Sequence, residues 1–211
     1  IPLCWETPGW ELEKRWVESA ILRTWSRAAD LQVTFAASCP APRTISDEAP
    51  FVRMAIGNHT DDSNGGGNGQ ARALGMDTLS WGYTALQFWF KPDHTANKGR
   101  VEYLAVHEFG HVLGFKHEQN QPSGRSCNVS QCASLPVGDQ LKCINDNSKL
   151  DGGVPLGPYD ANSIMNYCNR FLNMEGILSD GDIAAVQRAY GKPRFVLPDE
   201  ESSLLTWDSG R

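Results

Sequence analysis

The sequence predicts one domain that mixes α-helices and β-strands, a fold of the α+β class. Helical and strand-like hydrophobic patterns both recur along its 211 residues, of which 40% are hydrophobic. A chain of this length and composition can bury one sizeable core, which a cleft can divide into two lobes. Residues 101–115 are apolar on nearly every side, as in a helix buried beneath a sheet. We therefore expect helices to cover one sheet, with residues 101–115 at the centre.

The first half of the chain predicts a long helix and three strands. Apolar residues recur at helical spacing over residues 11–29, which predicts an amphipathic helix lying on a sheet. Apolar and β-branched residues over 31–35 and 51–56 predict two strands, and residues 85–90 predict a third. Within the third strand, residues 86–90 are the candidate edge, where an extended peptide could pair through its backbone.

A helix near the end of the chain is predicted by its boundaries. Ser179 followed by Asp182 is typical of a helix N-cap, and apolar residues follow at helical spacing. Gly191 predicts where this helix ends. Residues 196–211 are mostly polar and acidic, and we expect them to form a tail or a linker.

The clearest motif in the chain is three histidines and one glutamate at the spacing of a zinc site. One helical turn separates His107 from His111, so both imidazoles lie on one face of the predicted helix. Glu108 lies beside that face, within reach of a water molecule at the metal, and is the candidate general base. His117 joins them only if the chain turns sharply, and Gly114 permits that turn because glycine adopts left-handed conformations. Three imidazoles leave one position of a tetrahedral zinc open, as in catalytic sites.

A second motif follows the histidines and resembles the methionine turn of the metzincin zinc peptidases. It consists of Ser163, Ile164, Met165, Asn166 and Tyr167. In metzincins the methionine packs beneath the metal, and we assign Met165 a structural role rather than a role as metal ligand.

Within the metzincins, the chain is most similar to the astacin family. The resemblance includes Glu118 directly after the third histidine, and Tyr159 and Asp160 ahead of the methionine turn. The chain departs from the family where an arginine and an aspartate usually follow that glutamate, and where Asn166 replaces a frequent histidine. In astacins this glutamate often receives the mature amino terminus, but the sequence does not show that Ile1 is such a terminus.

The resemblance implies a two-lobed, metzincin-like catalytic domain. Such a domain has a twisted, mostly parallel sheet with an antiparallel edge strand, a long backing helix, a central zinc helix and a C-terminal helix. We expect a single domain over residues 1–211, with an upper lobe over about 1–117, a lower lobe over about 118–195 and the tail beyond.

The resemblance also implies a zinc-dependent endopeptidase that hydrolyses internal peptide bonds of proteins or peptides. Glu108 would accept a proton from the attacking water and pass it to the leaving amine. Tyr167 would bind the zinc ion at rest and stabilise the oxyanion during the reaction. Two alternatives stay open: an inactive, zinc-organised binding or adhesion module, and a zinc hydrolase of a non-peptide amide.

Composition and charge favour a secreted protein. The net charge of −6, the pI of about 5.3 and the lack of a Lys/Arg block argue against nucleic acid or an anionic membrane as partner. No apolar run is long enough to span a bilayer. We expect a secreted monomer whose leader, and with it an inhibitory propeptide, was removed or omitted before Ile1.

Six cysteines, an even number without a CxxC pair, predict disulfides rather than a second metal site. They are Cys4, Cys39, Cys127, Cys132, Cys143 and Cys168. Cys4 and Cys39 could join neighbouring segments, and the other four follow the zinc ligands.

One glycine-rich stretch, residues 61–69, combines acidic and amide side chains in the manner of a Ca²⁺ loop. It lacks the register of a known calcium motif, so we expect an ordinary loop there. His59 and His94 have no neighbouring cluster of ligands, and we expect both to be surface histidines.

Overall fold

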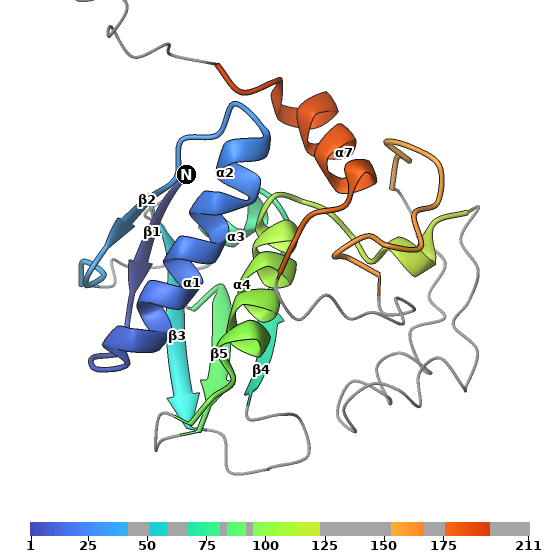
Figure 1. The fold of residues 1–211 in the computed structure, drawn as a ribbon. Coiled ribbons are helices and arrows are strands. Elements are labelled where there is room, and N and C mark those ends of the chain that lie inside the picture. The colour runs from blue at the N-terminus through green and yellow to red at the C-terminus, as the bar shows by residue number, and fades with distance from the viewer. Residues whose placement is uncertain are drawn as a thin grey trace, which may run out of the picture.

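The computed structural model describes residues 1–41, 51–58, 67–80, 84–91, 95–122, 153–166 and 176–194. Figure 1 shows helices packed against one side of a twisted sheet. In chain order the elements are β1 (Pro2–Trp5), α1 (Glu11–Arg23), α2 (Trp25–Ala28), β2 (Thr34–Ala36), β3 (Val52–Asn58), β4 (Gly67–Ala71), α3 (Asp77–Ser80), β5 (Leu86–Phe90), α4 (Lys98–Val112), η2 (Glu118–Asn120) and α7 (Asp180–Tyr190).

The sheet has the strand order β2-β1-β3-β5-β4. All neighbouring strands run parallel except β4, which runs antiparallel to β5. Leu86 of β5 therefore lies between Met54 of β3 and Ala71 of β4. The predicted mixed fold, with a mostly parallel sheet and an antiparallel edge strand, is confirmed.

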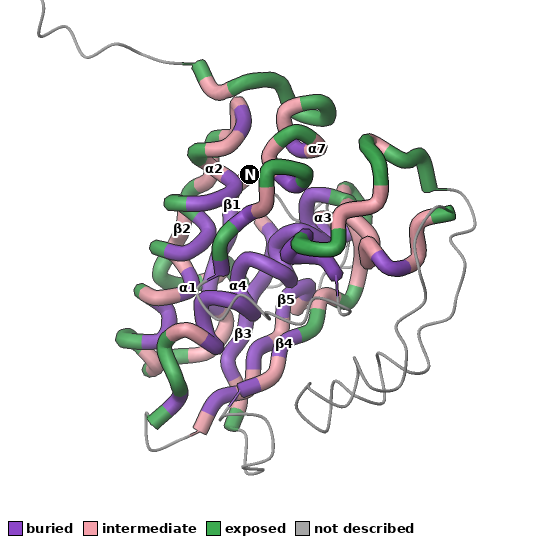
Figure 2. Tube along the Cα trace, turned by 45° about the vertical axis from the view of Figure 1, so that its right-hand side comes forward, coloured by how far each residue is buried: buried purple, intermediate pink, exposed green. Residues whose placement is uncertain are grey.

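The central helix α4 is the most deeply buried element of the fold. Every residue from Arg100 to Val112 is buried, as the sequence predicts (Figure 2). Helix α4 packs against α1 on one side and against β4 and β5 on the other. His107, Glu108 and His111 are thereby held within the core of the domain.

The sequence predicts one continuous helix over residues 11–29, but the structure has two helices there, α1 and α2. The break is at Thr24, whose φ of −109° and ψ of −94° are not helical and whose hydroxyl donates to the Ala20 carbonyl at 2.6 Å. Trp25 then turns into the core, donates from Nε1 to the Val106 carbonyl at 2.8 Å and stacks on Phe115. Burial of this indole overrides the helical periodicity, and a second, short helix begins at Trp25.

Two strands of the sheet, β1 and β4, are not predicted from the sequence, and β4 lies at an edge of the sheet. Strand β1 is short and begins with Pro2, and β4 is built largely from the glycine-rich stretch, so neither has the alternation that predicts a strand. Among the described strands, β2 and β4 lie at the two edges of the sheet, and β5 lies between β3 and β4. The prediction that residues 86–90 form the edge strand is therefore wrong.

A disulfide joins Cys4 of β1 to Cys39, which follows β2. It connects neighbouring segments, as the sequence suggests. The other four cysteines lie outside the described residues. Within the part of the chain that the structure describes, no helix is long and apolar enough to cross a membrane.

Candidate metal centre

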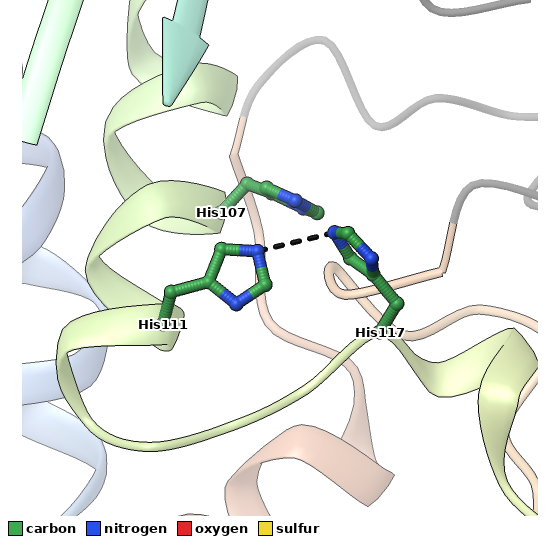
Figure 3. A group of neighbouring side chains, drawn as sticks. All are labelled: His107, His111 and His117. Atoms are coloured by element: carbon green, nitrogen blue, oxygen red, sulfur yellow. Dashed lines mark hydrogen bonds between the residues drawn. The ribbon is translucent and has the colours of Figure 1, made fainter. Parts of the chain in front are cut away.

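The structure brings the three predicted histidines together. His107 and His111 project from one face of α4, and His117 meets them from the segment that follows the helix (Figure 3). One nitrogen from each ring lies within 4.8 Å of the others. The Nε2 atoms of His111 and His117 are 3.1 Å apart, close to the roughly 3.3 Å expected between two ligands of a tetrahedral zinc.

The sharp turn that delivers the third histidine is centred on Gly114, as predicted. Its φ of +88° belongs to the left-handed region, where glycine carries no steric penalty. The Gly114 amide donates to the His111 carbonyl, and the Phe115 amide donates to the Gly110 carbonyl. The same His111 carbonyl accepts the amide of Gly75, so a distant turn also closes this helix end.

Two of the imidazoles have their tautomers fixed by backbone carbonyls. His107 Nδ1 lies 2.8 Å from the Ile164 oxygen, and His111 Nδ1 lies 2.7 Å from the Phe115 oxygen. Because a carbonyl oxygen only accepts, each Nδ1 must carry the proton, which leaves the Nε2 lone pair for a metal. Both rings thus present Nε2 towards the centre of the cluster.

The environment of the cluster favours the neutral form of His107. Burial, followed by the neighbouring His111 and His117, lowers the pKa of His107 well below its ordinary value. Neutral imidazole is the form that binds zinc. The donor set, its burial and its tautomers therefore fit one zinc ion.

Glu108, the candidate base, is held by the edge strand. The residue is buried, and its Oε2 accepts the Ala71 amide of β4 at 2.7 Å. A Cβ atom placed on Gly69 would lie 3.0 Å from Glu108 Cγ and 3.2 Å from Oε1. The glycine-rich sequence of β4 therefore leaves room for the Glu108 carboxylate. Neither Gly69 nor Ala71 is predicted from the sequence as a site residue, because both contacts depend on the pairing of β4 with the rest of the sheet.

Met165 packs on the zinc helix at Gly110. A Cβ atom on that glycine would approach Met165 Sδ to 2.4 Å, so only glycine allows this contact. The Met165 carbonyl accepts the amide of Glu118, which ties the turn to the residue after the third histidine. These contacts are consistent with a structural role for the methionine.

Glu118 does not contact the amino terminus. Its carboxylate accepts the Asp160 amide at 2.7 Å and the side-chain amide of Gln121 at 2.9 and 3.0 Å. The Ile1 ammonium donates instead to the carbonyl of Gln32.

A cavity of about 860 Å³ lies beside His117, between the segment over residues 153–162 and α7. Glu118 and Asp182 are among its lining residues, and burial raises the pKa of both carboxyl groups above their usual ranges. Hydrogen bonds to each carboxylate oppose that effect.

The C-terminal helix has the predicted cap. Ser179 and Asp182 form a reciprocal capping box, and the helix ends before Gly191. The carboxylate of Asp182 also reaches Ser163 and Ile164, which sequence spacing gave no means of finding.

Several predicted residues lie outside the described part of the chain. They are Tyr167, His59 and His94, together with residues 61–66 of the candidate calcium loop. Its last three residues, Gly67 to Gly69, belong to β4.

No protein-family model matches this sequence. Among solved structures, two of myroilysin are similar. One has 18% identity and a TM-score of 0.63, and the match covers 91% of this chain and 93% of that one. The other has 17% identity and a TM-score of 0.57, with coverage of 91% and 83%. A hatching enzyme zinc-protease, HCE-1 from Oryzias latipes (Medaka fish), matches at 17% identity and a TM-score of 0.47, with coverage of 89% and 88%.

The similarity to myroilysin extends over about nine-tenths of both chains in the first comparison. It shows that the two proteins share a fold. This fold agrees with the astacin-like metzincin architecture that the motifs of the sequence predict.

Proposed function

We propose that this protein is a secreted zinc-dependent endopeptidase. The observation that supports this most directly is the convergence of three histidines, two of them on the helix that also carries the buried Glu108. A zinc site that only stabilises a fold is closed by four protein ligands, whereas three imidazoles leave a position for water. A carboxylate next to that position has no purpose in a binding module and a clear one in hydrolysis.

Zinc held by His107, His111 and His117 would supply a Lewis acid that lowers the pKa of water and polarises a carbonyl. Glu108 accepts the proton of the attacking water and transfers it to the departing amine. The Ala71 amide keeps one carboxylate oxygen in place, so the other can face the water. The backbone carbonyls at Nδ1 keep two imidazoles oriented during the reaction.

The substrate would lie extended along β4. This strand is one of the two described edges of the sheet and the one that contacts Glu108, and an extended peptide can pair with such an edge through main-chain hydrogen bonds. The Ala71 amide, which holds the base, belongs to the same strand. A peptide bound there would therefore be aligned with the general base.

The remaining parts of the proposal follow from the resemblance. Tyr167 would stabilise the oxyanion, and the chain would act as a monomer with one two-lobed catalytic domain. An inhibitory propeptide would keep it latent before activation.

The proposal is tested with denatured casein as substrate. We expect cleavage that stops when a chelator removes the metal and returns when zinc is added. Glu108→Gln keeps the size of the side chain and its bond to Ala71 but removes the base. We expect it to retain one zinc per chain, measured by elemental analysis, and to lose at least about 100-fold in kcat.

The alternatives give different results. An inactive binding module would not cleave casein in any metal state. A hydrolase of non-peptide amides would hydrolyse small amides in a zinc-dependent way and leave casein intact. A zinc-free protein that cleaves casein would also contradict the proposal.

A further inference from the structure

A single peptide group connects His107 to the C-terminal helix. The carbonyl oxygen of this group, from Ile164, accepts a hydrogen bond from His107 Nδ1 at 2.8 Å. Its N–H, from Met165, donates to the Ser163 hydroxyl at 3.0 Å. That hydroxyl donates in turn to Asp182 Oδ1 at 2.6 Å.

We propose that Asp182 and Ser163 are positioning residues that set the tautomer and the zinc affinity of His107 through the Ile164–Met165 peptide. The inference rests on the proposed zinc site. Neither residue touches the metal or the substrate; both act on a ligand from a distance.

The geometry indicates a relay, a chain of hydrogen bonds that polarises His107, in addition to a contact that only stabilises the fold. In each step the donor and acceptor roles are fixed: the carboxylate accepts, the hydroxyl donates to it and accepts from Met165, and the carbonyl accepts from His107. Such chains polarise one another in the same direction. Electron density is thus shifted towards the imidazole, which makes Nε2 a stronger ligand.

The surroundings of the relay make it effective. Ser163, Ile164 and Asp182 are 2 to 6% exposed, so water does not compete for these bonds. The second oxygen of Asp182 accepts the amides of Ile164 and Ser179 at 2.8 and 2.9 Å. The backbone N–H groups of Ile164 and Ser179 therefore fix the carboxylate that begins the relay.

Two variants interrupt the relay in different ways. Ser163→Ala removes the hydroxyl and leaves the bonds of Asp182 to Ile164 and Ser179. Asp182→Asn keeps the shape and an oxygen for those backbone amides, but removes the charge and presents an N–H to Ser163. The matched control is Ser179→Ala, which removes the cap of the same helix and leaves all three bonds of the relay.

Two measurements separate a relay from a structural contribution. The ¹⁵N shifts of the His107 ring in the metal-free protein report its tautomer without zinc or activity. Competition with a chelator gives the zinc dissociation constant. Thermal unfolding of each variant is measured as a control, so that a change in the tautomer or in zinc affinity can be distinguished from a loss of stability.

We expect Ser163→Ala and Asp182→Asn to reduce the Nδ1–H tautomer of His107 and to weaken zinc binding about 10- to 100-fold. Ser179→Ala should lower the melting temperature without changing either quantity. If Asp182→Asn lowers only the melting temperature, or if Ser179→Ala weakens zinc equally, the relay is wrong. Failure of the wild type to bind zinc or cleave casein would contradict the proposed function instead, because the tautomer is measured without metal.

Discussion

Two regions that meet at the metal centre are stabilised in different ways. The amino-terminal region, the described residues of 1–112, is an apolar core between the sheet and helices α1 and α4. The carboxy-terminal region, the described residues of 113–194, has few regular elements and is joined by carboxylates that accept backbone and hydroxyl hydrogen bonds. The first region supplies two histidines and the base and holds the base through Ala71, and the second orients the two histidines through the Ile164 and Phe115 carbonyls and adds the third histidine.

This difference separates the formation of the fold from the adjustment of the site. Apolar burial is non-directional and tolerates small changes, so it defines where α4 lies. Hydrogen bonds to carboxylates are directional, so they define how an imidazole is turned. We expect substitutions in the two regions to affect different measurements.

The largest expected effect is on stability, from Phe88→Ala in the amino-terminal region. Phe88 is fully buried and stacks on Phe90 with ring centroids 5.9 Å apart. Its truncation should lower the free energy of unfolding by about 3 to 5 kcal/mol, measured by urea denaturation. The zinc affinity of the folded protein should stay unchanged, and Met76→Ala, at a side chain 76% exposed, should change neither value. A large loss of zinc affinity in Phe88→Ala would show that the regions are not separable.

The next largest effect is expected on kcat, from Gly69→Ala, and it tests whether the amino-terminal region does more than support the fold. Gly69→Ala would place a methyl group 3.0 Å from Glu108 Cγ and displace the base. We expect kcat to fall about 100-fold, with zinc affinity unchanged, because small displacements of a catalytic group are costly. Gly67→Ala is the matched control, since its Cβ would meet Phe90 at the same 3.0 Å. Equal losses of kcat in both variants would point to distortion of β4 as a whole.

The smallest effect is expected at the boundary between the regions. Gly110→Ala would bring a methyl group to 2.4 Å from Met165 Sδ, at a cost of about 1 to 3 kcal/mol in unfolding free energy. Alanine favours a helix over glycine by about 1 kcal/mol, so a net loss would report the collision. In a Met165→Ala background the same change should cost less, as a double-mutant cycle would show. Additive effects would mean that the contact does not couple the regions.

The same distinction explains what the sequence could predict. Helix α4, the turn at Gly114 and the capping box of Ser179 and Asp182 follow local rules, and the structure confirms them. The convergence of the three histidines also follows, because helical spacing and one glycine turn determine it. The apolar core was predictable in part, because the periodicity of apolar residues along each helix and strand indicates which face is buried.

Features that depend on contacts between distant residues were not predictable. Strand β4 is a strand because β5 offers it a partner, not because Gly67–Ala71 has strand propensity. The helix break at Thr24 depends on the pocket that receives Trp25. Asp160 and Glu118 meet across 42 positions, and no periodicity in the sequence indicates such a pair.

The His111 carbonyl, which accepts the amides of both Gly114 and Gly75, has a consequence for protein engineering. The end of the zinc helix is completed by a segment that precedes it by an entire strand, so an excised peptide over residues 98–117 would lack that closure. Transplanting the histidine motif onto an unrelated helix would transfer the ligands without their alignment. Metal binding at these histidines would thus depend on the assembled domain, and a minimal peptide mimic would lose part of its binding free energy to the ordering of its own backbone.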